Sequence, residues 1–346
     1  MAERTLTARE LNRALLARQL LLERSRLPIP RVLERMGGLQ AQYAPSMYVG
    51  LWTRLEGFER DQLTRLLERR RVVQGTLLRA TIHLVSMGDY WPFAVAIRES
   101  RRHWWLRAHR PPPNPRELAA ASERLRRRLT GGPLSRSEVE AVVGGDRALA
   151  NGVGLWLDLV RVPPSGTWER RRADLYEAAE SWIGPADVTY DAAAQHLVRR
   201  YLAGFGPSTR SALASWAGLP VARLDPVLGR MALRRFRAED GAELLDLPRT
   251  SLPDPETPAP VRFLPVWDAA LLAHARRASF LPEKYRSLVF STKTPQSTAT
   301  FLVDGAVAGA WKVERGRVVV SPFERLSRPV RRELRGEVER LDSLHA

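Results

Sequence analysis

Two glutamines one residue apart, Gln40 and Gln42, form the pattern in this sequence with the clearest use in chemistry. In an extended stretch, residues i and i+2 point to the same side, so the two carboxamides are expected to lie side by side. Each offers one acceptor oxygen and two donor hydrogens, enough to hold a water molecule or a base edge between them. Glutamine has no pKa near neutrality, so the pair can position a water but cannot remove its proton. Two glutamines on a surface turn are the alternative interpretation.

Other catalytic patterns are absent from the sequence. It contains no cysteine, which excludes disulfides, thiolate zinc sites, iron–sulfur clusters and thiol nucleophiles. The six histidines show no metal-ligand spacing, and no nucleotide-binding or serine-hydrolase motif is found. We therefore expect neither a metal nor a cofactor. No apolar run reaches the roughly 18 residues of a membrane helix, and no signal peptide is visible, so a cytoplasmic protein is expected.

The charge balance predicts a polyanionic partner. The 346 residues include 55 lysines and arginines against 38 acids, giving a net charge of +17 and a pI near 11.2. Nearly all of these cations are arginine, which a GC-rich genome explains, but such a genome does not explain their surplus over acids. A surplus of this size attracts nucleic acid, and charge alone does not distinguish DNA from RNA.

The first segment has the order of a winged helix, with helices followed by a hairpin. A capping box of Thr7 and Glu10 opens the first helix, and a fourth helix is expected over about 60–68. Two strand-like runs follow at 72–77 and 80–85. In this order a helix and the hairpin both approach DNA, so the sequence predicts a DNA-binding unit over residues 1–110.

The same order recurs twice, which predicts two further winged helices, over 111–184 and 185–250. The expected wing of the second unit comprises 161–163 and 166–168, and that of the third comprises 233–237 and 243–247. Residues 251–260 are rich in proline and indicate a linker.

Beyond the linker, residues 251–346 are predicted to form a small antiparallel barrel or sheet closed by a helix over about 329–344. Five runs of strand-forming residues support this prediction: 261–265, 287–292, 298–303, 306–313 and 317–320. The fold class is therefore α+β.

Several of these stretches resemble one family of proteins. Gln40 and Gln42 after a double glycine, together with 75–85, are similar to the first winged helix of the AlkZ/YcaQ-like bacterial DNA glycosylases. The run 199–209 resembles the family's third winged helix, and 263–277 and 301–305 resemble its C-terminal part. The resemblance covers nearly the whole chain in order. It implies three tandem winged helices and a C-terminal β-barrel that form a C-shaped clamp around DNA.

The resemblance also implies a function. Gln40 and Gln42 would be the catalytic residues of a monomeric, cofactor-free DNA glycosylase for base-excision DNA repair, of the type that unhooks interstrand crosslinks. Their oxygens are expected to hold the attacking water. Because carboxamides are poor bases, the substrate would be a purine alkylated at N7 or N3, which is cationic and leaves as a neutral molecule. A crosslinked base cannot flip into a pocket, so an open channel is expected.

Further residues are candidates for contacts with double-stranded DNA. Arg79 is expected to bind a phosphate, and His83 a phosphate or a base, although a structural histidine is the alternative. Lys293, Thr294 and Gln296 offer a cation and polar groups in a loop between two predicted strands. The chain departs from the family pattern at position 80, which is alanine where relatives usually carry glycine. The enzyme is expected in the cytoplasm, associated with the nucleoid.

A second hypothesis is a non-catalytic winged-helix regulator of transcription. A regulator should dimerise on a palindromic site, because half-site spacing mirrors the symmetry of the protein. Three winged helices and a barrel in one chain favour a monomer instead. An RNA-binding protein is a third alternative, since the charge suits either nucleic acid.

Overall fold

Four helices form the N-terminal region, and the first begins at its predicted capping box. The computed structural model describes residues 4–109, 114–274, 279–290 and 297–346. The first four helices are α1 (Ala8–Arg18), α2 (Ile29–Met36), α3 (Ala44–Trp52) and α4 (Arg60–Glu68). Both bonds of the capping box between Thr7 and Glu10 are present at the start of α1. Gly37, with φ +77°, ends α2 in the left-handed conformation that glycine adopts without strain.

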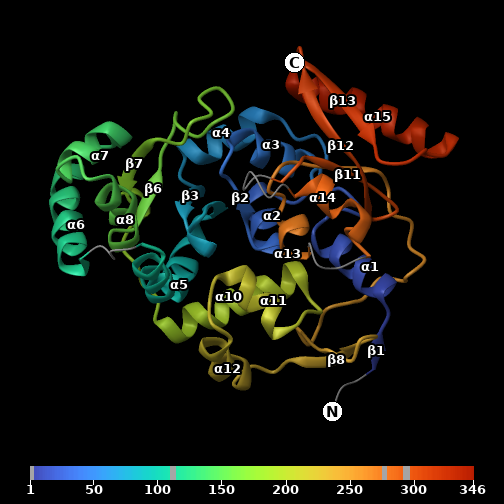
Figure 1. Ribbon diagram of the computed structural model, residues 1–346, viewed down its shortest axis with the longest axis horizontal. Helices are drawn as coiled ribbons and strands as arrows, with labels where there is room; N and C mark the ends of the chain where they lie inside the picture. Colours follow the sequence, from blue (N-terminus) through green and yellow to red (C-terminus); the bar gives the residue numbers. More distant parts are fainter. Residues whose placement is uncertain (1–3, 110–113, 275–278, 291–296) are drawn as a thin grey trace.

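A six-stranded antiparallel sheet, in the order β2-β4-β3-β6-β7-β5, extends from the centre of the molecule toward the left side of Figure 1. Its strands are β2 (Leu39–Gln40), β3 (Val72–Thr76), β4 (Ile82–Ser86), β5 (Leu134–Ser135), β6 (Leu159–Arg161) and β7 (Leu175–Ala178). The first predicted hairpin is confirmed as β3 and β4. Pairing of Gln74 with Arg161 and of Gly75 with Val160 joins it to the next hairpin, so both belong to one sheet.

The wing predicted in the second unit is wrong in its return strand. The sequence predicts strands at 161–163 and 166–168, but the chain returns only at β7. Pro163 and Pro164 end the first strand because proline has no N–H to donate to a neighbour. The intervening loop folds around the Ser165 hydroxyl, which accepts from the backbone N–H groups of two residues near the start of β7. The helices of this region are α6 (Pro115–Leu129), α7 (Arg136–Val142), α8 (Arg147–Trp156) and α9 (Ala179–Ile183).

Two long helices pack against each other, and the first of them contacts strands β3 and β4 of this sheet. They are α5 (Met87–Ala108), which the sequence analysis did not predict, and α10 (Tyr190–Phe205). Phe93 and Ile97 of α5 share a buried core with Leu197 and Tyr201 of α10. The two helices thereby connect the first hairpin to the third unit of the chain.

The third predicted hairpin is confirmed. The third unit contains α11 (Arg210–Ala217), α12 (Val221–Gly229), β8 (Arg234–Ala238) and β9 (Glu243–Asp246). The N-terminal strand β1 (Thr5–Leu6) adds to this hairpin in parallel with β8, at the lower edge of Figure 1. Residues 251–260 form neither helix nor strand, as their prolines predict.

The C-terminal region is an open sheet, and the predicted β-barrel is wrong. Its four strands run in the order β10 (Arg262–Leu264), β11 (Thr300–Val303), β12 (Ala306–Glu314) and β13 (Arg317–Pro322). The predicted strand 287–292 begins instead within a short helix, α14 (Arg286–Val289), which leaves too few strands to close a barrel.

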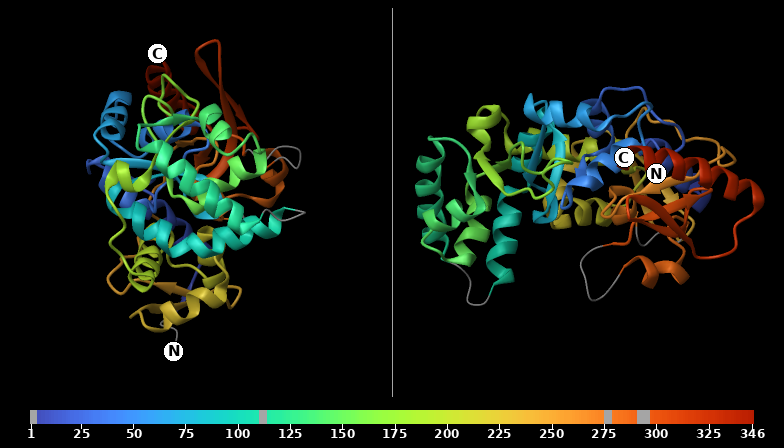
Figure 2. Two further views of the ribbon diagram at one scale, coloured as in Figure 1. Left: turned by 90° about the vertical axis from the view of Figure 1, so that its left-hand side faces the viewer. Right: turned by 90° about the horizontal axis from the view of Figure 1, so that it is seen from above.

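The last helix, α15 (Arg328–His345), covers the open sheet in place of a closing strand. It lies alongside β13 in the views of Figures 1 and 2. Leu334 and Leu341 of α15 share one core with Trp311 and Val318 of the sheet and with helices α2 and α3. The number of winged helices, their boundaries and the C-shaped outline stay predictions.

Candidate active site

A short strand pair places Gln40 opposite His83. Strand β2 pairs antiparallel with β4, with Leu39 opposite Leu84 and Gln40 opposite His83. This close pairing requires glycine at position 38, where a Cβ atom would lie 2.9 Å from a methyl carbon of Val85. The double glycine before the glutamines therefore brings the first of them against the hairpin.

The two glutamines occupy different environments. Gln40 is only 8 % exposed, whereas Gln42 lies two residues on at the surface. The guanidinium of Arg79 donates from Nη2 to Oε1 of Gln40 at 3.2 Å. The backbone N–H of Ile82 donates to Oε1 of Gln42 at 2.7 Å. Both partners are obligate donors, so each carboxamide has its oxygen turned toward the protein.

This arrangement leaves the amide ends of the glutamines available. Within the described ranges, neither Nε2 atom has a hydrogen-bond partner. Each oxygen has two lone pairs, and one of them already accepts a hydrogen bond from the protein. The groups of the pair that stay without a partner are therefore mainly N–H donors, where the sequence analysis expected carbonyl acceptors to hold a water.

A small enclosed cavity adjoins Gln40. Its volume of about 10 Å³ is close to the space that one water molecule needs. Four segments of the chain line it, contributing Gly37, Gly38, Gln40, Arg79, His83, Trp216, Ala269 and Leu272. Ala269 and Leu272 belong to α13 (Ala269–His274), and Arg79 to a 3-10 turn, η1 (Leu78–Ala80). No carboxylate is present among these lining residues.

His83 is held as a neutral imidazole. Burial, reinforced by the positive charge of Arg79, lowers the pKa of His83 to about 3. Its Nδ1 lies 3.0 Å from the carbonyl oxygen of Thr81. Since a carbonyl only accepts, Nδ1 carries the proton and Nε2 is an acceptor. A neutral His83 can orient a hydroxyl or a water but is a weak base at neutral pH.

Arg79 is cationic but mostly enclosed. Burial lowers the pKa of Arg79 to about 10, which still leaves the guanidinium protonated at neutral pH. Its Nη1 donates to the backbone carbonyl of Trp216, at the end of α11. Arg79 and Ala80 both have positive φ, +53° and +55°. A positive φ is a conformation that glycine adopts without strain and alanine does not.

The comparisons with known proteins agree with this architecture. A model of the AlkZ-like DNA glycosylase family matches residues 33–344. The chain belongs to this family. It is thus a DNA glycosylase, and DNA is its partner. No curated protein sequence matches the chain significantly.

A solved structure shares the fold of this AlkZ-like glycosylase. Streptomyces sahachiroi DNA glycosylase AlkZ superposes with a TM-score of 0.82 at 20 % sequence identity. The alignment covers 99 % of this chain and 98 % of that one. Two chains with so few identical residues share an architecture, while the chemistry has to be argued from the residues of each. None of the helices in the described parts of this chain combines the length and apolarity needed to cross a membrane.

The predicted site residues of this AlkZ-like glycosylase fall into two groups. Gln40, Arg79 and His83 line the same cavity, and Gln42 follows directly at the surface. Lys293, Thr294 and Gln296 lie outside the described residues. Ser297, the next described residue, is buried, and its side-chain oxygen accepts from the backbone N–H of Trp267 at 2.8 Å, just before α13.

Trp216 and Leu272 are cavity residues that the sequence analysis missed. Trp216 packs against Phe93, Tyr201 and Phe205 and offers its backbone carbonyl to Arg79. No local pattern connects α11 with the glutamines, because the contact is made across more than one hundred residues of sequence. The one signal in the sequence is Gly218, which ends α11. A glycine at this position is consistent with a close approach of two chain segments.

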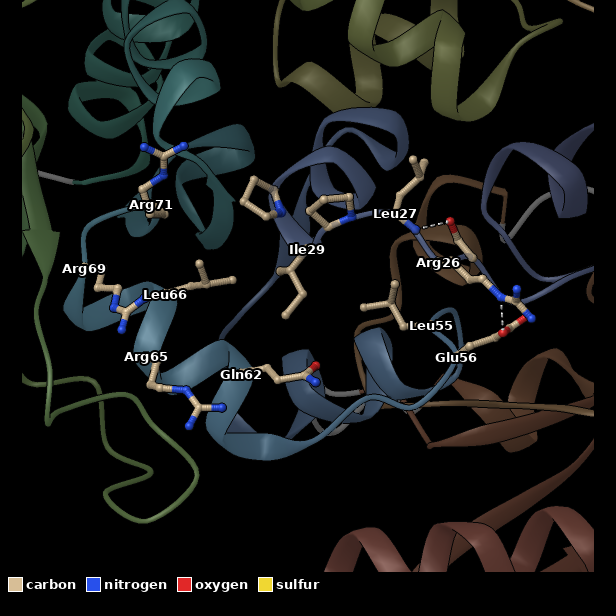
Figure 3. A pocket seen from close by; sticks show the side chains of 13 residues that line it. Arg26, Leu27, Ile29, Leu55, Glu56, Gln62, Arg65, Leu66, Arg69 and Arg71 are labelled. Atoms are coloured by element: carbon tan, nitrogen blue, oxygen red, sulfur yellow. Dashed lines mark hydrogen bonds and ion pairs between the residues drawn. The ribbon is translucent and has the colours of Figure 1, made fainter.

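A second and larger hollow lies between α2 and α4, apart from the cavity at Gln40. This groove has a volume of about 530 Å³, and Figure 3 shows the side chains that line it. Arg65, Arg69 and Arg71 project from its α4 side, and Arg26 pairs with Glu56 at its other end. None of the candidate site residues is among the described residues that line this groove, which is a basic surface.

Proposed function

We propose that this glycosylase hydrolyses the N-glycosidic bond of purines alkylated at N7 or N3 and unhooks DNA interstrand crosslinks. The product is an abasic site, and Gln40 and Gln42 are the catalytic residues. The enzyme acts as a monomer on double-stranded DNA without a metal or cofactor. This proposal names the lesion and the residues within the activity that the family establishes.

One observation carries the proposal: the site offers hydrogen-bond donors and only a weak base, the neutral His83. No carboxylate is found among the described residues that line the cavity beside Gln40, and the pKa of His83 is about 3. A normal purine needs help from acid–base groups to leave, whereas a cationic alkylpurine does not. The site therefore suits a substrate whose own charge drives the bond cleavage.

The reaction balances without an enzymatic base. As the bond between C1′ and the purine nitrogen breaks, its electron pair neutralises the positive charge of the alkylated ring. The sugar becomes an oxocarbenium ion, a water adds to C1′, and its proton passes to solvent. The free N–H groups of Gln40 and Gln42 suit acceptor atoms of the departing purine, whose electron density rises during cleavage.

A strand-scission assay tests this proposal. A duplex with a single N7-alkylguanine, and its interstrand-crosslinked counterpart, are incubated with the protein and then heated in alkali to cleave abasic sites. Scission at the lesion is the expected result on both substrates. Tight binding without scission on either substrate would overturn the proposed lesion class.

Substitution of the glutamines assigns the chemistry. Gln40→Ala and Gln42→Ala are expected to lower the single-turnover rate by about 100-fold or more, because each removes an oriented donor. Affinity for undamaged DNA should stay within twofold of the original value. Gln42→Glu is the matched variant, since it keeps the size and the acceptor for Ile82 but loses the N–H donors. A rate equal to wild type in all three variants would remove these residues from the mechanism.

A further inference from the structure

Arg79 connects the catalytic candidate Gln40 to the end of a distant helix. Its guanidinium donates from Nη2 to the side-chain oxygen of Gln40 and from Nη1 to the backbone carbonyl of Trp216. Trp216 is the second-last residue of α11, where unpaired carbonyls give the helix end its partial negative charge. Two arms of the guanidinium fork are therefore bound to acceptors of the protein itself.

The backbone of Arg79 is also fixed from two sides. Its φ of +53° is unusual for a residue with a side chain and persists only where the surroundings enforce it. Gly218, which ends α11, lies directly against it: a Cβ atom there would stand 3.0 Å from the backbone nitrogen of Arg79. The turn that carries Arg79 and the end of α11 thus fit together at close range.

We propose that Arg79 is a positioning residue, which holds the carboxamide of Gln40 with its oxygen inward and its amide toward the DNA. This inference rests on the proposed catalytic role of Gln40. The sequence predicts a different role, in which Arg79 binds a phosphate of the DNA. In the positioning role the guanidinium acts on the reaction through Gln40 and makes no contact with the DNA.

The chemistry of the two groups explains why arginine suits this role. A guanidinium has only donors, so Gln40 cannot rotate its amide end toward Arg79 without losing the hydrogen bond. The bond to the oxygen also polarises the carboxamide, which makes its N–H groups stronger donors. Lysine carries the same charge but lacks the planar fork that spans two fixed acceptors.

Two substitutions distinguish the roles. Arg79→Met removes the guanidinium and keeps much of the side-chain volume, and a positioning role predicts a fall of about 100-fold in the single-turnover rate. Arg79→Lys keeps the charge and is expected to lose about tenfold, although a phosphate contact would survive in it. Affinity for DNA and its salt dependence should remain those of the wild type in both variants. Arg69→Met, in the basic groove, is the matched control and should retain the full rate.

A double-variant cycle then tests whether Arg79 acts through Gln40. Added to Gln40→Ala, the Arg79→Met change should cause no further loss of rate, because the group that Arg79 positions is already gone. Losses that multiply would overturn the inference. So would a DNA affinity that falls in Arg79→Met with a salt slope reduced by about one phosphate contact.

The outcomes separate this inference from the proposed function. If Gln40→Ala excises at the wild-type rate, the catalytic assignment fails and the role of Arg79 fails with it. If Gln40→Ala loses activity while Arg79→Met and Arg79→Lys keep it, only the role of Arg79 is overturned. Thermal unfolding of each variant shows whether a lost rate comes from a lost fold, and the lysine variant, which keeps the charge, provides the test if the methionine variant does not fold.

Discussion

The cavity beside Gln40 and the groove between α2 and α4 both contain arginine, but they hold it in opposite ways. In the cavity, Arg79 is enclosed and donates to two fixed acceptors. In the groove, Arg65, Arg69 and Arg71 are exposed and have no ion-pair partner among the described residues. The same residue type is hydrogen-bonded to the protein at one hollow and exposed to solvent at the other.

The difference separates two uses of positive charge. An exposed arginine adds to the long-range field that attracts DNA, and salt screens its effect. A buried arginine has given up its water shell, so it is stable only where protein acceptors replace that water and fix its geometry. Replacing an enclosed arginine near the cavity should therefore alter the geometry of the site and the stability of the fold. Replacing an exposed arginine in the groove should alter the rate of association with DNA.

The largest effect on stability is expected at a buried ion pair next to the cavity. Arg54 and Asp268 are fully buried and share two hydrogen bonds of 2.9 Å, immediately before α13. Asp268→Ala would leave the Arg54 charge buried without a partner, which should lower the free energy of unfolding by about 3–5 kcal/mol.

The ion pair of Arg26 and Glu56 in the groove is the matched control. Because its arginine side chain is 86 % exposed, Glu56→Ala should cause no measurable change. Urea unfolding of both variants compares the two regions directly. Equal urea midpoints for Asp268→Ala and Glu56→Ala would contradict the prediction that an enclosed arginine depends on its ion-pair partner more than an exposed one does.

A smaller, pH-dependent effect is expected from His83. Its pKa falls from an ordinary value near 6.5 to about 3 on folding, so the folded protein keeps it neutral while the unfolded chain protonates it. Its contribution to stability is therefore fully present above about pH 6.5 and is lost as the pH falls toward 3. At about pH 5 the loss amounts to about 2 kcal/mol.

The variant His83→Asn isolates this contribution. Asparagine cannot titrate, and its amide can still donate to the carbonyl of Thr81. The stability difference between about pH 7 and pH 5 should therefore be smaller in the variant than in the wild type. The prediction would be wrong if stability fell equally with pH in the variant and the wild type. His83 would then have the same protonation in the folded and the unfolded protein.

Features set by neighbouring residues were predictable from the sequence. The capping box at Thr7, the glycine that ends α2 and the hairpin of β3 and β4 all depend on contacts within a few residues. The predicted strand at 287–292 failed because a short apolar run is compatible with a buried helix as well as a strand.

The arrangement of the site depends on contacts between distant segments, which the sequence does not reveal. Spacing alone predicts that Gln40 and Gln42 lie side by side, but it does not reveal that Gln40 is buried while Gln42 is exposed. Trp216 reaches Arg79 only because α10 and α11 pack against the first hairpin. Which end of each carboxamide is free could be decided only with these donors in place.

The smallest effect is expected in the groove. Replacing Arg65, Arg69 and Arg71 together by glutamine removes three exposed charges from a chain of net charge +17. Association with DNA in about 10 mM salt should slow by about twofold to threefold, because the Debye length there is about 30 Å. In about 1 M salt, where that length is about 3 Å, the two proteins should associate equally fast. The single-turnover rate of excision should not change at either concentration. A defect in association that persists in high salt would show that the groove contacts DNA directly. The arginines of the groove would then act through direct contacts, as Arg79 does, and would differ from it only in what they contact.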